Sequence, residues 1–600
     1  MADWSPAGLA AVFMCAKALR DAAVFDKGVR DIERKNTVFV TVLVLLHLFC
    51  SSLSARPTTA HQARKVVTGW LRADFQPLGT ALGRGVLKVD TFTDSAGEPV
   101  YHVVYLQPSG FVVVSADDSV EPIIAFADDG TYDPSLGNPL GALVSQDLNE
   151  RVTAARTPSH PKAGPQKPAP ADPADHQNKW NRFASIAEAS ENTFAFMGTI
   201  SPSDIRVAPL LQSKWSQSYV CGNSCYNYYT PDNYRCGCVA TTMAQLMRYH
   251  QYPVVGIGVQ GFWIRKDYSD WYAAYTRGGD GAGGPYKWSD MVAVPDCSTT
   301  LTQRQAIGAL CYDVAISINT NFCSDHGEAD TRQAKDALIN TFQYGNAVKG
   351  YNAGANIGPG LIRMINPNLD AKDPVILGVN GSSSHAVLCD GYGYNYSTLY
   401  HHLNMGWGGT YDAWYNLPTI DCDPAYSLVY KCVYNIHITD GGNGEVVSGR
   451  ILNDKGRPIA NATVDAKPDS RVVYIRANSD GKGIYAFDSL SSKTIYTISP
   501  VATGYVFQSQ SVVTGTSSDN SANSGNVWGV DFYGQVLIVS DLNHDGVVDM
   551  ADFAVFTSAW LAKPGDASWN PDCDISTPAD DFIDAQDLAV FVQDWLASGQ

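Results

Sequence analysis

Cys238 opens a segment with the pattern of an amphipathic helix, residues 237–250. Apolar residues repeat along it at helical spacing, which buries one side and fixes the direction of the sulfur: Ala240, Met243, Ala244 and Met247. The amide groups of a first helical turn are unpaired and carry partial positive charge, so a thiol there is shifted toward the reactive thiolate. The pattern fits a nucleophile, and it also fits a small buried cysteine that opens a core helix.

A thiolate needs a histidine beside it to move protons near neutral pH. His250 lies 12 residues along the same helix, about 18 Å from Cys238, which is too far. His401 and His402 are adjacent, so a strand would send them to opposite faces. His385 follows a loop of small residues and opens a strand-like run, which makes it the best-placed partner. The alternative interpretation is that His385 is a structural histidine whose hydrogen bonds are made within the core.

Five segments, taken together and in this order, resemble the streptopain family of secreted papain-like cysteine peptidases. They are PLLQSKWSQ (209–217), GCVATTMAQLMRYHQYP (237–253), GPYKWSDM (284–291), SSHAVLCDGYGY (383–394) and HLNMGWGGTYDAWYNL (402–417). The resemblance implies a papain-like two-lobed fold for residues 205–440, with Cys238 as the nucleophile and His385 as the general acid and base. It also implies an oxyanion hole formed by the Gln217 side chain and the amide of Cys238.

One position departs from the pattern of this family. Family members commonly read Asn-Trp-Gly-Trp where this chain has Asn404-Met405-Gly406-Trp407. Papain-like enzymes orient the catalytic imidazole with a polar side chain and shield it with an indole, so Asn404 and Trp407 are both candidates for contact with His385. Met405 is a soft apolar residue, so we expect altered packing and retained activity.

Cys236 is the rival nucleophile, two residues before Cys238. The chain has 13 cysteines, ten of them between Cys221 and Cys432, which favours an oxidising compartment. We therefore expect Cys236 to be a disulfide or core cysteine, with Cys221 and Cys225 as candidate partners. A zinc site of Cys221, Cys225, Cys236 and Cys238 is a weaker alternative.

The N-terminal residues have the layout of a secretory signal. An apolar run at 38–49 follows basic residues and precedes a small-residue stretch, and it is short for a membrane span. We assign 1–55 to a signal peptide with an extended N-region, with a signal anchor as the alternative. The protein is then secreted or associated with the cell surface, with no membrane contact after signal removal. A formal charge of -18 argues against nucleic acid as a partner.

Six hundred residues are too many for one hydrophobic core. Residues 56–156 show strand-like alternation, predict a small α+β domain, and resemble the propeptide or inhibitor domain that precedes these peptidases. Such a domain would occupy the cleft or displace the catalytic histidine, so the chain's own propeptide is an expected inhibitor. Residues 157–204, rich in Pro and Ala at their start, are assigned to a linker and activation region.

Residues 445–535 contain short β-rich runs with regular turns, which predicts a β-sandwich. The runs SGRILNDKGRPIANATV and SDGKGIYAFDSL resemble carboxypeptidase regulatory-like domains. No catalytic constellation is visible there, so a spacer or a weak binding module is expected.

Residues 538–600 hold twelve Asp and one Lys, and Asp552–Leu561 repeats at Asp587–Leu596. The first copy follows oxygen ligands at calcium-loop positions 1, 3, 5, 7, 9 and 12: Asp541, Asn543, Asp545, Val547 (carbonyl), Asp549 and Asp552. The second loop is irregular and is expected to bind weakly or not at all: Asp574, Ser576, Asp580, Phe582, Asp584 and Asp587. The unit resembles a dockerin, which implies structural calcium and a cohesin-type partner.

The sequence therefore predicts a multidomain α+β chain. A small α+β propeptide precedes a papain-like peptidase core, and a β-sandwich and an α-helical dockerin-like calcium module follow it. The predicted function is a secreted cysteine endopeptidase made as a zymogen, which cleaves protein or peptide substrates, needs no cofactor for catalysis and is tethered through its tail. The alternatives are an inactive papain-like adhesion or scaffold protein, and an acyl transferase of the transglutaminase type.

Overall fold

The computed structural model describes residues 56–157, 173–189, 203–353, 356–379, 384–417, 429–438, 444–470, 473–543, 545 and 547–596. The predicted signal peptide lies outside these residues. Residues from Arg56 onward form one compact unit. Within the described ranges, no helix has the length and apolar character that a membrane crossing requires.

The N-terminal domain is α+β, as its alternating pattern predicts. Helix α3 (Ala60–Ala73) begins at a capping box in which Thr59 and Gln62 satisfy each other's backbone amides. An antiparallel meander follows, made of β1 (Gly85–Thr93), β2 (Pro99–Gln107), β3 (Phe111–Ser115) and β4 (Ile123–Ala127). Helix α4 (Pro139–Arg156) then packs against β2, capped at its start by the Asn138 side chain.

A helix occupies part of the segment predicted to be a linker. Helix α5 (Pro173–Glu188) places Trp180, Phe183 and Ile186 in the same buried cluster as Trp70 of α3. A Cβ at Gly69 would lie 1.8 Å from the Phe183 carbonyl oxygen, so glycine is required at this crossing. The linker prediction is wrong for this stretch because three apolar residues at helical spacing follow the Pro/Ala-rich run, and they complete the N-terminal domain.

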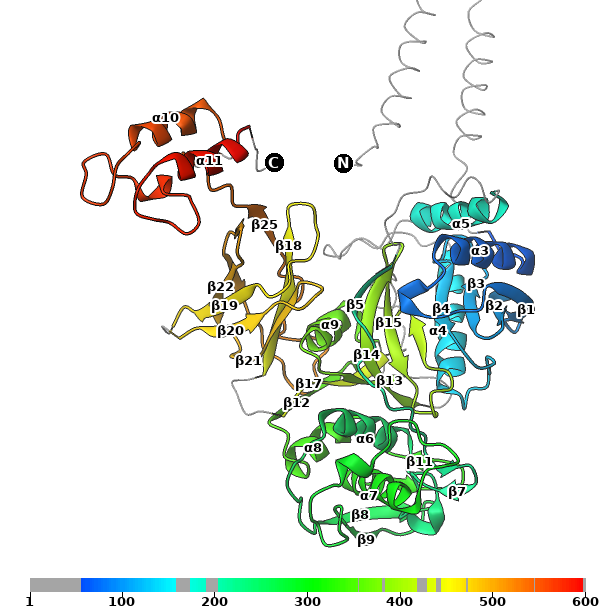
Figure 1. Cartoon of the computed structure of the whole chain (residues 1–600). Helices are drawn as coiled ribbons and strands as arrows, with labels where there is room; N and C mark the ends of the chain where they lie inside the picture. The colour runs from blue at the N-terminus through cyan, green and yellow to red at the C-terminus, as the bar shows by residue number, and fades with distance from the viewer. Residues whose placement is uncertain are drawn as a thin grey trace, which may run out of the picture. The chain divides into compact units, whose positions relative to one another are not determined.

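The peptidase region contains a helical lobe and a sheet lobe (Figure 1). The helical lobe is built on α6 (Cys238–His250), α7 (Leu301–Ser317) and α8 (Gln333–Asn340), with short strands β6 (Tyr219–Val220), β7 (Asn223–Ser224), β8 (Gly261–Lys266), β9 (Tyr272–Tyr275), β10 (Asn321–Phe322) and β11 (Gly327–Glu328). The sheet lobe holds β5 (Ser203–Val207), β12 (Asn346–Tyr351), α9 (Leu361–Asp370), β13 (Val375–Val379), β14 (His385–Asn395), β15 (Thr398–Asn404), β16 (Ala413–Tyr415) and β17 (Val429–His437).

Alternate residues of the central strands enter two different cores. On β14, Ala386 and Leu388 face the cluster that contains α6 and α7, whereas Val387 and Cys389 face the cluster that contains α9 and α4. Side chains of a β-strand alternate between faces, so a strand covered on both sides is apolar throughout. This double burial holds β14 rigidly and positions the residue at its start.

The N-terminal domain and the peptidase share one sheet. Among the described residues it has eleven strands, in the order β1-β2-β3-β4-β16-β15-β14-β13-β17-β12, with β5 paired to β14. The join is between β4 and β16, where Trp414 pairs with Phe126 and Tyr415 with Ala125. The N-terminal domain is therefore attached by backbone hydrogen bonds as well as by side chains.

Residues from Glu445 to Val536 form the β-sandwich that the turn spacing predicts (Figure 1). Among the described residues its sheets follow the orders β21-β18-β25-β23 and β20-β19-β22-β24. The strands are β18 (Glu445–Asn453), β19 (Thr463–Pro468), β20 (Ile475–Asn478), β21 (Ile484–Leu490), β22 (Ile495–Val501), β23 (Tyr505–Val506), β24 (Gln510–Val513) and β25 (Phe532–Val536). Residues of both sheets, such as Val447, Tyr485 and Ile498, share one core.

A buried carboxyl joins the peptidase to the sandwich and predicts a pH effect on stability. Asp370, at the end of α9, accepts hydrogen bonds of 2.7 Å from Tyr392 Oη and from Ser448 Oγ of β18. Burial raises its pKa to about 7, against the lowering influence of its hydrogen-bond donors and of Lys372 and Arg206. Between about pH 4 and pH 7 the folded chain therefore holds a proton that the unfolded chain has lost, so stability falls as pH rises through 7.

We expect the melting temperature to be lower at pH 8 than at pH 5.5, and Asp370→Asn to remove part of that difference. Thermal denaturation of both proteins across this range measures the effect. An unchanged pH slope in the variant would show that this carboxyl is not the group responsible.

The C-terminal residues form two short helices around a small aromatic core (Figure 1). Helix α10 (Met550–Ser558) contributes Phe556, and α11 (Ala585–Gln593) contributes Phe591, whose ring stacks on it at 5.3 Å. Each helix begins at a capping box built from two aspartates, Asp549 with Asp552 and Asp584 with Asp587. The structure thus reproduces the predicted repeat of a loop followed by a helix.

Candidate active site

Cys238 is the first residue of α6, as predicted, and the backbone around it explains its exposure to a cavity. Gly237 adopts a φ of 95°, and a Cβ there would lie 2.6 Å from the Gly327 carbonyl oxygen. Only glycine tolerates both this positive φ and this close backbone approach, so glycine lets the chain turn sharply into the helix. No side chain caps this helix start. Burial raises the pKa of the Cys238 thiol, and the Ala386, Val239 and Cys238 amides oppose that rise.

His385 is the first residue of β14, also as predicted, and its neighbour Ala386 connects the strand to the helix. The Ala386 amide donates to Cys238 Sγ at 3.4 Å, and its carbonyl accepts from Thr242 Oγ1 at 3.2 Å. Cys238, His385, Gln217 and Trp407 all line one cavity of about 900 Å³. The structure therefore brings four of the five predicted catalytic residues to one place.

A loop of the N-terminal domain enters the same cavity. Ser135 and Gly137 line it, and the backbone of Leu136, between them, forms a hydrogen bond with His385. Burial lowers the pKa of His385 despite that contact, and burial raises the pKa of the Cys238 thiol. In this form of the chain desolvation therefore outweighs the amides of the helix start, opposite in direction to the shift expected from the sequence.

Asn404 and Trp407, the two candidates for holding His385, have different surroundings. The Asn404 side chain is buried, donates to the Ser213 carbonyl at 3.0 Å and accepts from Gln245 Nε2 at 2.9 Å. Trp407 lines the cavity beside His385, and among the described residues its indole nitrogen has no hydrogen-bond partner. Met405 is fully buried in the core of the sheet lobe, so the departure from the family pattern is accommodated by packing.

Gln245 supports the site and was not identified from the sequence. It lies two turns beyond Cys238 on α6 and is fully buried. Its Oε1 accepts from Ser213 Oγ at 3.0 Å and from the Trp215 amide at 3.1 Å. It therefore ties the loop that leads to Gln217 to the helix that carries Cys238. The sequence signal for this supporting role was the polar side chain of Gln245 between apolar residues of the helix.

The other cysteines in the described part of the chain separate into one disulfide and a set of buried thiols. Cys221 is bonded to Cys297 and Cys225 is a free thiol, so neither of the two candidate partners is bonded to Cys236. Cys236 is a fully buried free thiol, hydrogen-bonded with Cys311, which fits the predicted core cysteine. The disulfide at Cys221 also removes one ligand from the four-cysteine zinc alternative.

The two predicted calcium loops differ in how their carboxylates gather. In the first loop, one oxygen from each of Asp541, Asp545 and Asp552 lies within 4.8 Å of the others. In the second loop, Asp574 accepts a hydrogen bond from the amide of Asp581, which adopts a φ of 61°, and the Ser576 amide donates to Asp587. The donor set of the first loop is all oxygen, which suits calcium.

A thiol at a helix start and an imidazole at a strand start, sharing one cavity in a two-lobed fold, are typical of cysteine peptidases. Residues 215–415 match the model of the peptidase C10 family, and residues 55–151 match that of the Spi protease inhibitor. These matches support a cysteine peptidase preceded by an inhibitor-like domain.

Two curated relatives support this class. Streptopain of Streptococcus pyogenes serotype M1 is 24% identical over 356 residues, covering 56% of this chain and 77% of the relative. The thiol protease/hemagglutinin PrtT of Porphyromonas gingivalis is 25% identical over 383 residues, covering 62% of this chain and 40% of the relative. Among solved structures, a prointerpain A fragment of Prevotella intermedia is 17% identical with a TM-score of 0.41, covering 58% of this chain and 98% of that one.

Proposed function

We propose that this chain is a secreted endopeptidase whose nucleophile is Cys238 and whose general acid and base is His385. The observation that carries the proposal is the shared cavity, since a helix-opening thiol, a strand-opening imidazole and Gln217 line the same space. The disulfide between Cys221 and Cys297 supports an oxidising compartment.

The reaction follows from these positions. His385 takes the proton of the Cys238 thiol, and the sulfur attacks the scissile carbonyl carbon. The carbonyl oxygen becomes an oxyanion that accepts hydrogen bonds from Gln217 and from the Cys238 amide. His385 gives its proton to the leaving amine, which breaks the peptide bond and leaves an acyl-enzyme. His385 then takes a proton from water, and the resulting hydroxide attacks the acyl carbon and expels the Cys238 thiolate with release of the acid. His385 returns the proton to the sulfur, which restores the thiol.

Latency in this proposal comes from the loop around Leu136. The loop occupies part of the cavity, and its backbone engages the imidazole that must otherwise serve Cys238. The raised pKa of Cys238 and the lowered pKa of His385 favour a neutral thiol and a neutral imidazole, which is a poorly nucleophilic pair. Departure of the propeptide would let water and substrate reach both groups.

Gln217→Ala should lower kcat by about 10² to 10³-fold, the usual cost of one missing oxyanion donor. The change should leave KM nearly unaltered, because the bond strengthens only in the transition state. Steady-state hydrolysis of a peptide substrate by the processed enzyme measures both constants. A kcat within threefold of the parent would remove Gln217 from this role.

A hydrolase and an acyl transferase with the same dyad differ in what accepts the acyl group. Casein and a labelled primary amine, offered together to the processed enzyme, separate the two. The proposal predicts cleaved casein with little incorporated amine. Incorporation without cleavage would assign the chain to transfer chemistry instead.

We further propose that the tail binds structural calcium through its first loop and tethers the enzyme to a cohesin-type partner. Asp541, Asp545 and Asp552, with Asn543 between them, offer the oxygen ligands that calcium prefers. The exposed aromatic residues Trp560 and Trp595 recur at matching positions of the two copies, which suits a surface made for a partner.

Asp545→Ala should weaken calcium binding to the tail by at least about tenfold, since it removes a direct ligand from a compact loop. Asp580→Ala in the second loop should change the measured affinity little. Calorimetric titration of the full chain with calcium tests both, and Asp566→Ala, outside both loops, is the matched control. Equal losses in the three variants would point to general charge effects.

A further inference from the structure

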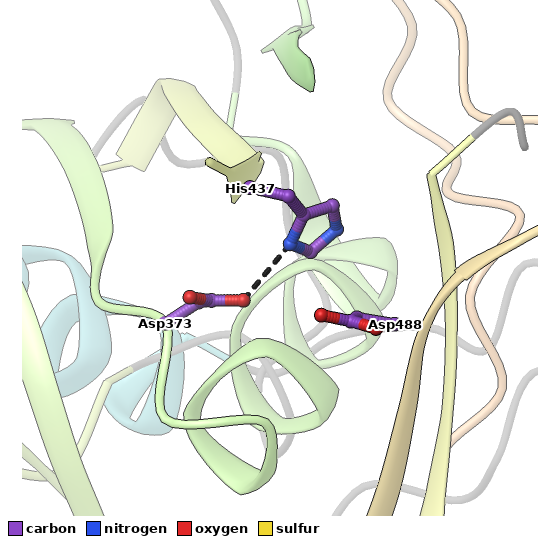
Figure 2. Close-up of side chains that lie close together, drawn as sticks. All are labelled: Asp373, His437 and Asp488. Atoms are coloured by element: carbon purple, nitrogen blue, oxygen red, sulfur yellow. Dashed lines mark hydrogen bonds and ion pairs between the residues drawn. The ribbon is translucent and has the colours of Figure 1, made fainter. Parts of the chain in front are cut away.

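A histidine and two carboxylates from separate elements meet where the peptidase adjoins the β-sandwich. His437 ends β17, Asp373 lies just before β13, and Asp488 belongs to β21 of the sandwich. One ligand atom from each lies within 4.8 Å of the other two. Figure 2 shows both carboxylates directed toward the imidazole.

The burial of His437 gives an independent indication of a ligand. Its side chain is 1% exposed, and its Nδ1 contacts Asp373 Oδ2 at 2.9 Å. Among the described residues, Nε2 has no hydrogen bond of acceptable geometry, although the Gly444 backbone lies close to the ring. A buried polar atom without a partner is costly, so an ion that accepts the Nε2 lone pair would relieve a real deficit.

The surroundings of Asp373 match those of a carboxylate that orients a metal-binding histidine. Metal-ligating imidazoles usually present their second nitrogen to a carboxylate, which sets the tautomer and raises ligand basicity. Asp373 holds Nδ1 of His437 through one oxygen, and its other oxygen lies 3.7 Å from Nε2 of His250. The carboxylate is thus fixed from two sides, which leaves the second nitrogen of His437 and the exposed Asp488 to face an ion.

We propose that His437 and Asp488 bind a divalent transition-metal ion of the zinc class at the junction of the peptidase and the sandwich, while Asp373 orients the imidazole. An imidazole with carboxylates is a donor set that zinc accepts, whereas calcium favours oxygen ligands alone. The ion would add a direct link between the two domains, beside the Lys372–Asp480 ion pair of 3.1 Å. It would also connect to the C-terminal end of α6, the helix that begins at Cys238.

Zinc titration of the full chain tests this proposal. The protein carries Cys238→Ala, so the thiol that lines the active-site cavity cannot take up the metal, and it is stripped of metal and saturated with calcium before zinc is added. We expect one zinc ion per chain by calorimetry. Asp488→Asn should weaken that binding at least tenfold, and zinc should raise the melting temperature of the parent but not of the variant.

Asp480→Asn is the matched control, because it removes a sandwich carboxylate from the same junction without touching the cluster; it should bind zinc like the parent. Asp488 is exposed, so its substitution leaves the core intact, and His437→Asn provides a second variant at the other ligand. Equal zinc affinity in the parent and in Asp488→Asn would overturn the proposal, as would the absence of any zinc binding. Neither result bears on the role of Cys238, which is tested by chemical labelling.

Discussion

Replacing Cys238 by alanine is expected to abolish hydrolysis and self-processing, with a loss of at least about 10⁴-fold in kcat/KM. The sulfur forms the covalent bond to the substrate in the proposed mechanism. Among the described cysteines, Cys238 is the free thiol that lines the cavity. Incubation of the purified zymogen, followed by gel analysis and a peptide assay, measures both effects.

Cys236→Ala is the control for this substitution. Cys236 lies two residues away, is fully buried and contacts Thr241 Oγ1 at 3.4 Å. Its loss should cost some stability and leave processing and turnover close to those of the parent. If the two variants exchanged these behaviours, the nucleophile would have been assigned to the wrong cysteine.

The second large effect, a loss of latency, is expected when a buried contact between the propeptide and the peptidase is broken. Arg151 of α4 is buried, binds Asp147 at 2.7 Å and donates to the side chain and the backbone carbonyl of Asn416, next to β16. Tyr415 Oη donates to the other oxygen of Asp147 at 2.6 Å. Removing Arg151 leaves a buried carboxylate without its cation, which typically costs about 3–5 kcal/mol.

Arg151→Ala should therefore loosen the propeptide. We expect Cys238 of the uncut chain to react with a small alkylating agent at least tenfold faster than in the parent, and conversion to the mature form to accelerate. Mass spectrometry of the intact protein follows both. Lys88→Ala serves as the control, because it breaks an exposed ion pair with Asp90, and such pairs contribute little. Unchanged alkylation in Arg151→Ala would mean that this contact does not keep the site closed.

Local patterns predicted the positions of the two reactive residues well. The apolar spacing after Cys238 predicted the start of α6, and the small-residue loop before His385 predicted the start of β14. Both signals are carried by a few neighbouring residues, which is why the sequence alone was sufficient. Their catalytic roles stay predictions until they are measured.

Features that depend on distant residues were missed. The Cys221–Cys297 disulfide joins residues 76 positions apart, and spacing alone cannot choose among the cysteines of an oxidised domain. The contact of Leu136 with His385 depends on how the propeptide docks, which local pattern does not encode. Helix α5 was overlooked because its apolar face is short and completes a core formed by α3.

Local sequence also could not decide whether Asn404 contacts His385. A polar residue beside the catalytic segment could either orient the imidazole or support the scaffold, and its sequence neighbours are identical in both cases. In the structure, the Asn404 side chain forms hydrogen bonds with Gln245 and Ser213, whereas Trp407 lines the cavity with His385. We therefore expect Trp407 to be the residue that shields the imidazole.

The central claim, that Cys238 is the nucleophile of a peptidase held latent by its propeptide, is tested most directly by labelling with an epoxysuccinyl inhibitor. The uncut zymogen and the processed enzyme are each treated, and the adduct is located by peptide mass mapping. The account predicts one adduct, on Cys238, in the processed enzyme and little in the zymogen. An adduct on another cysteine, or equal labelling of the two forms, would contradict it.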